Sequence, residues 1–252
     1  MRIIRLHLLF GAAVLSLAAA SACAQGFTVT TNFPPITFAE ALRSHGITDL
    51  SEESLIAALR NSDPEVRSLA ANKLAEDGHL DAVQAIEAAL ADERDLNAQA
   101  NIAEALSALH DPKGVEHLHS MCTDPSMPSK GLVAALQVLE ITNSSSAICA
   151  NNVLASMRQE KDAGDIEVES LMLPLMYRDA SPELARRIFE TLKSFLSDKQ
   201  QQMGVRLTAS QALAQIGSPE SVEAIRTALP QETDSTLRQS FERDLGALKK
   251  KP

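Results

Sequence analysis

Apolar residues recur at helical spacing along most of the chain, and the pattern is clearest over residues 66–90. A first stripe has the three-four spacing of one helix face and consists of Val66, Leu69, Ala70 and Leu74. Gly78 follows it, and glycine adopts at little cost the left-handed conformation that commonly ends a helix. A second stripe consists of Leu80, Val83, Ile86 and Leu90. Because neither helix could bury its stripe alone, the pattern predicts a helical hairpin stacked against similar hairpins.

The same pattern returns over residues 205–229. Aligned without a gap, 11 of 25 positions are identical, among them Val66/Val205, Arg67/Arg206, Leu74/Leu213, Gly78/Gly217 and Ile86/Ile225. The offset of 139 residues is near four times ~35, a spacing typical of helical repeats. The two copies are therefore predicted to be members of a longer array.

Helix starts are marked along the chain by a side-chain oxygen at the N-cap and a proline at the first helical position, where the missing N–H costs nothing. These starts are Asp63-Pro64, Asp111-Pro112, Ser181-Pro182 and Ser218-Pro219. Thr37 and Glu40 have the spacing of a capping box, which predicts an earlier helix.

Together these signals predict six hairpins, each with a first (A) and a second (B) helix. The A helices cover 37–45, 64–77, 96–109, 129–142, 166–178 and 203–216. The B helices cover 51–60, 79–92, 112–122, 146–160, 182–197 and 219–229. A last helix over 235–249 is polar enough to cap the array. Pro174 is predicted to kink its helix or to end its first half.

The run Asp63-Pro64-Glu65-Val66-Arg67, followed by an alanine-rich helix, a glycine and a second helix, resembles the short HEAT-like repeats of the phycobilisome-lyase type. The resemblance covers most of 37–248 and is strongest over 51–122 and 200–248. It implies an all-α, right-handed superhelical solenoid of about six HEAT-like hairpins. That repeat class serves many partners, so the resemblance says little about function.

Residues 1–24 read as a signal peptide. Arg2 and Arg5 form a basic start, Leu8–Ala20 is apolar, and Ala22-Cys23-Ala24 fits a cleavage site before Gln25. We therefore predict an exported protein, periplasmic or extracellular. Ala20-Ser21-Ala22-Cys23 also resembles a weak lipoprotein signal, so a lipid anchor on Cys23 is the less favoured alternative. No other apolar run approaches the length of a membrane span.

Two short terminal segments flank the repeats. Residues 25–36 carry Phe27, Phe33 and Pro34-Pro35, and we predict an extended strap over the first repeat, with docking elsewhere as the alternative. The basic tail, 249–252, is predicted to complement the negative end of the last helix.

The composition is acidic and poor in aromatic residues, with 3% aromatic residues and no tryptophan. Removing the signal peptide leaves 21 basic and 33 acidic residues, because it contains two arginines and no acids. The resulting net charge of −12 argues against nucleic acid or an anionic membrane surface as a partner.

Cys122 and Cys149 remain after cleavage, and an even number of cysteines in an exported protein suggests a disulfide. The predicted layout argues against it. If neighbouring B helices run parallel, Cys122 lies late in one and Cys149 early in the next, near opposite ends. We therefore predict two free thiols.

Candidate chemistry is sparse. His110, His117 and His119 are close in sequence, but His117 and His119 point in different directions on a helix and Pro112 separates them from His110, so no metal site is predicted. The chain contains neither a glycine-rich phosphate loop nor a G-x-S-x-G motif.

Enzymes built on similar repeats are poor matches. Di-iron hydroxylases with HEAT-like repeats bind their metals through His-Glu dipeptides, and this chain has none. HEAT-like DNA glycosylases have a basic groove with aromatic residues, whereas this chain is acidic and has no tryptophan. A bilin lyase activity stays open, although no tetrapyrrole site is marked. We predict no cofactor.

In HEAT-type solenoids the B helices line the concave face. Aligning them on Val83, Val115, Ala185 and Val222 gives two outward rows, Gln84, Glu116, Arg186 and Glu223, and Glu87, His119, Phe189 and Arg226. Mixed charge with one phenylalanine fits a protein-binding surface, and it is also what an ordinary solvated helix face looks like. From these rows we predict the protein-binding residues Glu87, His119, Arg186, Phe189 and Arg226.

The sequence therefore favours a non-enzymatic protein-binding scaffold of the periplasm or cell envelope, with an unidentified protein partner. Two alternatives stay open. One is an enzyme or a cofactor- or lyase-type carrier built on HEAT repeats, and the other is a structural subunit of an envelope complex.

Overall fold

The computed structural model describes residues 36–159 and 162–248. Within these ranges the regular structure consists of 13 α-helices and three short 3-10 turns, without any strand. The α-helices are Phe38–Ser44 (α2), Glu52–Ala58 (α3), Pro64–Glu76 (α4), Val83–Asp92 (α5), Leu96–Ala108 (α6), Pro112–Thr123 (α7), Ser129–Ile141 (α8), Ala150–Gln159 (α9), Ala163–Arg178 (α10), Pro182–Ser197 (α11), Met203–Ile216 (α12), Pro219–Ala228 (α13) and Ser235–Leu248 (α14). The 3-10 turns are Leu80–Ala82 (η1), Ala147–Cys149 (η2) and Leu229–Gln231 (η3).

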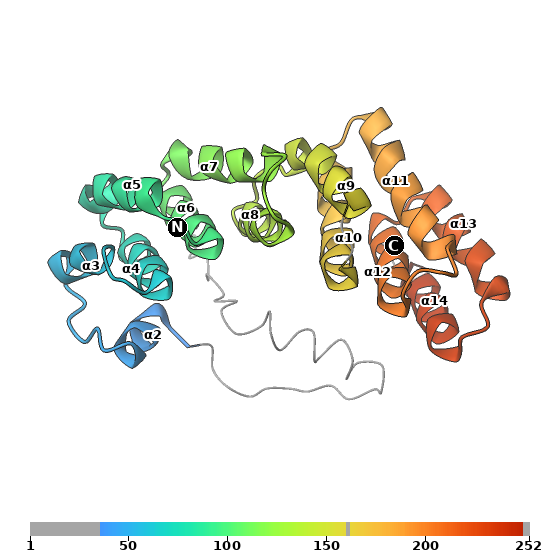
Figure 1. Ribbon diagram of the computed structural model, residues 1–252, viewed down its shortest axis with the longest axis horizontal. Helices are drawn as coiled ribbons and strands as arrows, with labels where there is room; N and C mark the ends of the chain where they lie inside the picture. The colour runs from blue at the N-terminus through green and yellow to red at the C-terminus, as the bar shows by residue number, and fades with distance from the viewer. Residues whose placement is uncertain (1–35, 160–161, 249–252) are drawn as a thin grey trace.

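The helices pair into six hairpins, from α2 with α3 to α12 with α13, and α14 closes the array. Each A helix packs against the A helices before and after it, so that α4, α6, α8, α10, α12 and α14 form one continuous layer. The B helices form a second layer, and the two layers bend into an arch (Figure 1). The predicted all-α solenoid of about six hairpins is confirmed.

The prediction that B helices line the concave face is wrong. Figure 1 shows α5, α7, α9, α11 and α13 on the outer side of the arch and the A helices on the inner side. Side-chain size gives the reason. Buried alanines, such as Ala71, Ala103, Ala135 and Ala209, let neighbouring A helices approach closely. The arch then closes toward this shorter layer.

The helix boundaries follow the local signals closely. The side chains of Asp63, Asp111, Ser181 and Ser218 each accept a backbone N–H in the first turn of the helix that they precede. Thr37 and Glu40 form the predicted capping box. Asp162 accepts the N–H of Gly164 at 2.7 Å, and α10 therefore begins before the predicted residue 166. This helix continues through Pro174, so the proline does not end it.

Left-handed residues end the A helices at the predicted glycines, with φ of 75° at Gly78 and 66° at Gly217. At the ends of α6 and α8 the same conformation is adopted by His110 and Asn143. His110 therefore has a structural role, because it adopts the left-handed conformation at the end of α6.

The core repeats along the array in the register that the sequence predicts, with one exception. Leu74 and Leu213 occupy equivalent positions, and neither has any exposed surface. Leu80, the first residue of the second predicted stripe, is 67% exposed. It belongs to η1, whose 3-10 geometry places it off the inward face of α5.

Gly114 allows α7 to lie directly against α6. A Cβ atom at this position would lie 2.4 Å from the carbonyl oxygen of Ala103 and 2.7 Å from the amide nitrogen of Ser107. We expect Gly114→Ala to destabilise the protein by about 1–3 kcal/mol, because backbone cannot move aside as a side chain can. The measurement is urea denaturation followed by circular dichroism.

A matched control for Gly114→Ala is Gly246→Ala in α14, where a Cβ atom would meet nothing within 4 Å. This change should stabilise the protein by about 0.5–1 kcal/mol through helix propensity alone. Equal effects of the two substitutions would show that the α6–α7 approach is not tight.

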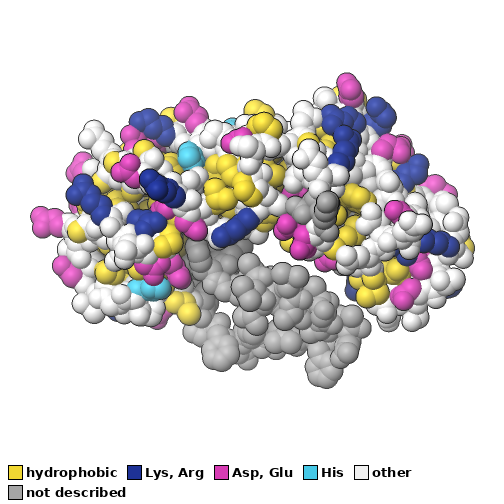
Figure 2. Space-filling model, in the orientation of Figure 1, with side chains coloured by type: hydrophobic (Ala, Val, Ile, Leu, Met, Phe, Trp, Pro, Cys, Tyr) yellow, Lys and Arg dark blue, Asp and Glu magenta, His cyan; other side chains and the backbone are white. Residues whose placement is uncertain are grey.

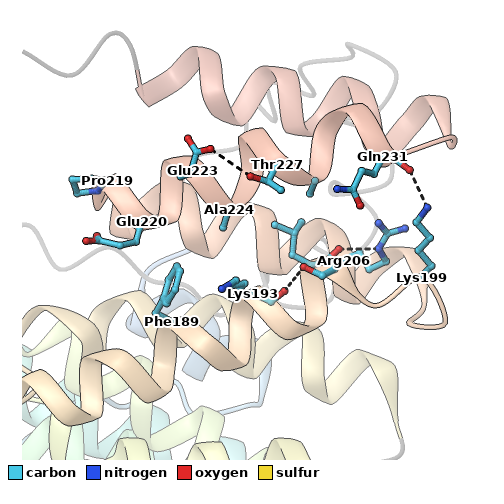
Figure 3. A pocket seen from close by; sticks show the side chains of 13 residues that line it. Phe189, Lys193, Lys199, Arg206, Pro219, Glu220, Glu223, Ala224, Thr227 and Gln231 are labelled. Atoms are coloured by element: carbon cyan, nitrogen blue, oxygen red, sulfur yellow. Dashed lines mark hydrogen bonds between the residues drawn. The ribbon is translucent and has the colours of Figure 1, made fainter.

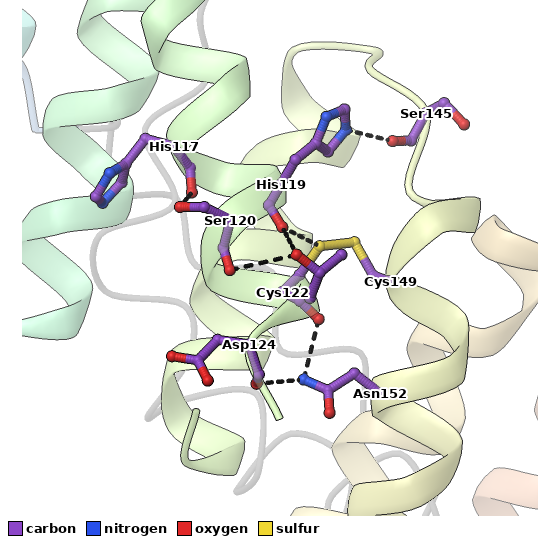
Figure 4. Close-up of a disulfide and its surroundings, with 9 residues drawn as sticks. His117, His119, Ser120, Cys122, Asp124, Ser145, Cys149 and Asn152 are labelled. Atoms are coloured by element: carbon purple, nitrogen blue, oxygen red, sulfur yellow. Dashed lines mark hydrogen bonds between the residues drawn. A yellow bond between two sulfur atoms is a disulfide. The ribbon is translucent and has the colours of Figure 1, made fainter. Parts of the chain in front are cut away.

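The prediction of free thiols is wrong, because Cys122 and Cys149 form a disulfide with 5.1 Å between their Cα atoms (Figure 4). Neighbouring B helices were expected to lie parallel and side by side. Instead, the last turn of α7 meets η2 at the start of α9, and Asn152 Nδ2 donates to the Cys122 carbonyl oxygen at 3.1 Å. The two thiols therefore meet at one point on the outer layer.

The predicted signal peptide (1–24), nearly all of the segment 25–36 and the basic tail (249–252) lie outside the described residues. In the part of the chain that is described, none of the helices is both long and apolar enough to cross a membrane.

Candidate functional site

A groove of about 670 Å³ lies between the outer helices α11 and α13 (Figure 3). Both helices pack against α12, which contributes Arg206 to the lining. The lining residues are Phe189, Lys193, Leu196, Ser197, Lys199, Arg206, Pro219, Glu220, Glu223, Ala224, Thr227, Ala228 and Gln231. The lining thus combines apolar residues with lysines from the α11 side and glutamates from α13.

Phe189 is the aromatic residue of the groove. Its ring is half-buried and packs partly against the core, while the rest faces the groove toward α13 (Figure 3). Lys193, one turn further along α11, holds its ammonium group 5.6 Å from the ring centroid. A cation over an aromatic face is favourable, and it fixes the edge of the groove at this point.

The far end of the groove is built on a buried ion pair between Arg206 of α12 and Glu232, which follows η3. The Arg206 side chain is 8% exposed and that of Glu232 is 4% exposed. Arg206 also donates through Nε to the carbonyl oxygen of Leu196 at 3.2 Å, at the end of α11. Glu232 accepts the backbone N–H groups of Thr233 and Asp234. The pair therefore ties three helices together at one end of the groove.

The first sequence copy contains the same device. Arg67 of α4 donates to Glu93 through Nε at 2.6 Å and through Nη2 at 2.7 Å. Glu93 accepts the N–H groups of Arg94 and Asp95, as Glu232 does from Thr233 and Asp234. We call the Arg67–Glu93 and Arg206–Glu232 pairs the arginine clips.

The glutamates of both arginine clips are held ionised. Burial by itself would raise the pKa of Glu93, but hydrogen bonds from Arg67 and from backbone N–H groups outweigh burial and lower it. The pKa of Glu232 is lowered in the same way, against the effect of burial, by backbone N–H groups and by Arg206. The glutamates are thus fixed, neutralised partners of their arginines.

Of the predicted binding residues, Phe189 lines the groove and Arg226 lies beside it. Arg226 Nη1 is 2.9 Å from Glu223 Oε2, and Glu223 is a lining residue. Arg186 is exposed on α11 but does not line the groove. The C-terminal half of the predicted row thus gathers around one groove.

The N-terminal half of the row does not reach this groove. Glu87 of α5 forms an ion pair with Lys113 of α7 at 2.6 Å. His119 Nε2 lies 2.9 Å from the carbonyl oxygen of Ser145, in the loop before η2 (Figure 4). Both side chains therefore connect neighbouring repeats along the outer layer.

Titratable groups with shifted pKa values are scattered. Burial raises the pKa of Glu104 to about 7 and lowers the pKa of His117, and neither residue lines the groove. Among the residues that the structure describes, no cluster of three or more His, Cys, Asp or Glu side chains has an arrangement that could hold a metal ion. Figure 2 shows acidic and basic side chains interspersed over one face, without a continuous basic stripe.

The sequence analysis missed the arginine clips, although a signal was present. The alignment of the two copies continues beyond Leu90 and Leu229. Extended by five residues, it adds the identities Glu93/Glu232 and Asp95/Asp234. A glutamate that recurs at a fixed distance from a recurring arginine is the expected trace of such a pair.

The fold and the repeated hairpins define an α-helical solenoid. The family description "HEAT repeats" matches residues 52–140, and "PBS lyase HEAT-like repeat" matches residues 205–229. HEAT-type repeats are thus shown over these two segments of the chain.

Two solved structures are similar to this chain. One is human deoxyhypusine hydroxylase in complex with glycerol, with 16% sequence identity over 92% of this chain and 85% of that chain, and a TM-score of 0.43. The other is the complex of CpcE and CpcF of phycocyanin lyase from Nostoc sp. PCC7120, with 25% identity over 79% of this chain and 77% of that chain, and a TM-score of 0.46. No curated protein matches the sequence.

Proposed function

We propose that the protein is an exported protein-binding scaffold of the periplasm or cell envelope and that it binds its partner in the α11–α13 groove. The observation that carries the proposal is the groove itself, with a half-buried phenylalanine at its edge. Interfaces concentrate their binding energy in a few partly buried aromatic and arginine residues surrounded by polar rims.

The groove has the composition of such an interface. Phe189, Ala224 and Ala228 contribute apolar surface to it, and Lys193 and Glu223 are charged lining residues from α11 and α13. Phe189 offers a large apolar surface that is already held in place by Lys193 and the core. A partner that covers the ring would gain contact area without ordering a mobile side chain.

The disulfide supports the export part of the proposal. Disulfides persist in oxidising compartments and are rare in the cytosol. A buried Cys122–Cys149 bridge therefore fits a chain whose first residues read as a signal peptide.

A lyase-type carrier is the second candidate function, and one observation favours it. The PBS lyase HEAT-like repeat, residues 205–229, forms α12 and α13 and therefore the base and one wall of the groove. The groove volume of about 670 Å³ is within the range of small-molecule sites. Incubating the purified protein with a bilin and recording its absorption spectrum tests this candidate.

The binding site is tested by photo-crosslinking in the native host. With benzoylphenylalanine in place of Phe189, we expect ultraviolet light to give one discrete protein adduct in the envelope fraction. The matched control places the same residue at Ile148, which is 58% exposed and does not line the groove.

Phe189→Ala should remove about 1–2 kcal/mol of stability, because half of the ring packs inward.

The partner is then identified from the adduct and purified, and its affinity is measured for wild type and for Phe189→Ala. We expect the affinity to fall by about 10-fold or more, the loss typical of an aromatic hot spot. Adducts of equal yield from positions 189 and 148, or unchanged affinity in a folded variant, would remove the groove as the binding site.

Export has a separate readout. Mass spectrometry of the protein from its native host should find Gln25, free or cyclised, at the N-terminus. A lipid-modified Cys23 would mean that the protein is exported as a lipid-anchored protein and not cleaved before Gln25. Retention of Met1 in the cytoplasm would contradict both versions of export.

A further inference from the structure

A second groove, of about 420 Å³, lies between α3 and α5 near the other end of the arch. Six of its lining positions are the repeat equivalents, 139 residues earlier, of residues that line the α11–α13 groove. These positions are Arg60, Arg67, Ala85, Ala88, Ala89 and Asp92, equivalent to Lys199, Arg206, Ala224, Thr227, Ala228 and Gln231. An arginine clip forms one end of each groove. The internal repeat has thus built the same concave surface twice.

The middle of the α3–α5 groove is suited to a helix. Ala85, Ala88 and Ala89 present only methyl groups along α5, and Ile56 adds apolar surface on the α3 side. Small side chains allow a backbone to approach closely, and a straight apolar groove between two helices can receive the apolar face of a third, amphipathic helix.

The charges at the rim of the groove determine whether an acidic or a basic segment of a partner is favoured there. Arg67 is neutralised by Glu93, so this pair contributes no net charge. Arg60 and Arg94 are exposed lining residues, and their side chains make no ion pair or hydrogen bond with any part of the chain that the structure describes. Asp92 is the remaining acid of the rim. On a chain with 33 acidic and 23 basic residues, this surplus of positive charge beside an apolar groove is local.

We infer that the α3–α5 groove is a second docking site, which takes an amphipathic helix of a partner protein with acidic residues flanking its apolar stripe. The inference rests on the proposed function, because the α11–α13 groove is the first such site. Arg60 and Arg94 pair with the acidic flanks, and Ala88 and Ala89 receive the apolar stripe. With a groove at each end of the arch, one chain engages two segments, and linked segments bind more tightly than either does alone.

Two fluorescein-labelled peptides test the inference on the mature chain at low salt. They share a leucine stripe at helical spacing, and one has glutamates along its flanks where the other has lysines. Fluorescence polarisation should show saturable binding of the glutamate peptide that weakens as salt is added. The lysine peptide should bind at least about 10-fold more weakly, since like charges then face each other at the rim.

Variants locate the peptide in the groove. Reversing the rim charge with Arg60→Glu and Arg94→Glu should weaken binding of the glutamate peptide by about 10-fold or more. The charge-matched control is Lys130→Glu with Arg158→Glu, two exposed residues that do not line either groove. It should change binding by less than about threefold, the effect of net charge alone. Ala88→Trp fills the groove without changing its charge and should abolish binding.

Each contrary result overturns the inference. These results are equal affinity for the two peptides, equal effects of the rim and control reversals, and unchanged binding in Ala88→Trp. Binding that is lost only when Lys193 and Lys199 are reversed would place the peptide in the α11–α13 groove, leaving the proposed function standing. If the crosslink at position 189 fails while the α3–α5 variants behave as expected, the proposed function falls and this site stands by itself.

Discussion

Replacing Arg206 with alanine is expected to lower the free energy of unfolding by about 3 kcal/mol, because Glu232 would stay buried without the arginine that neutralises it. The loss extends beyond the pair. Arg206 also donates to the Leu196 carbonyl oxygen, and Glu232 organises the turn that leads into α14 through the N–H groups of Thr233 and Asp234. Urea denaturation of the mature chain, followed by circular dichroism, measures the change. Arg67→Ala should behave similarly, because it leaves Glu93, whose side chain is 1% exposed, without its partner.

Two controls separate the arginine clip from charge in general. Arg226→Ala removes a pair in which both side chains are 62% exposed, and it should cost at most about 0.5 kcal/mol. The double variant Arg206→Met with Glu232→Leu removes both buried charges together and should recover much of the loss. A cost for Arg206→Ala no larger than that for Arg226→Ala would show that the clip does not stabilise the fold.

The pH dependence of this effect has a definite sign. The pKa of Glu232 is lowered in the folded protein, so the carboxylate stabilises the fold at pH values above its unfolded pKa of about 4.3. That contribution is lost as the pH falls through the lower, folded-state pKa. The difference between wild type and Arg206→Ala should therefore be full at pH 7 and shrink in acid.

The fold could be predicted from the sequence because its signals are local. Asp63 and Ser218 act within one turn of their own helices, and Gly78 and Gly217 act at a single backbone angle. Even the ends of α6 and α8 follow this rule, with His110 and Asn143 in the place of glycine. A hairpin repeated along a chain needs little more than these signals and an apolar stripe.

The groove could not be predicted in the same way, because it depends on where separate hairpins meet. Arg206 and Glu232 are 26 residues apart, and only the packing of α11, α12 and α13 shows that the pair forms the end of a groove. Phe189 was predicted because it stands among polar residues in its row. Glu87 and His119 shared that row, yet their side chains are engaged with neighbouring repeats, which a helical alignment does not show.

The wrong prediction with the widest consequences concerned which layer of helices lies on the inner side of the arch. A repeat pattern fixes which helix faces are buried but not whether the A or the B layer is shorter. The close approach of alanine-rich A helices places the B helices on the outer side, and α7 then meets η2 at the start of α9. The wrong side for the predicted binding row and the wrong state of the cysteines both follow from this one property.

Removing the disulfide is therefore expected to weaken a specific joint of the arch. The bridge closes a loop between residues 27 positions apart, and its loss in the double variant Cys122→Ala with Cys149→Ala should cost about 2–4 kcal/mol. Asn152 Nδ2 continues to join the two sides of the joint through the carbonyl oxygens of Cys122 and Asp124. Urea denaturation of wild type and variant, both without reductant, measures the difference.

The location of the damage separates this joint from the rest of the array. Because repeats are held mainly by their neighbours, amide hydrogen exchange should accelerate over α7, η2 and α9 while α4 keeps its protection. Reductant should destabilise wild type but leave the double variant unchanged, since the variant has no bridge to lose. Thiol titration of unfolded, unreduced protein should find neither Cys122 nor Cys149 reactive. Two reactive thiols in protein from its native host would mean that the bridge does not form there. The proposal of export to an oxidising compartment would then lose its structural support.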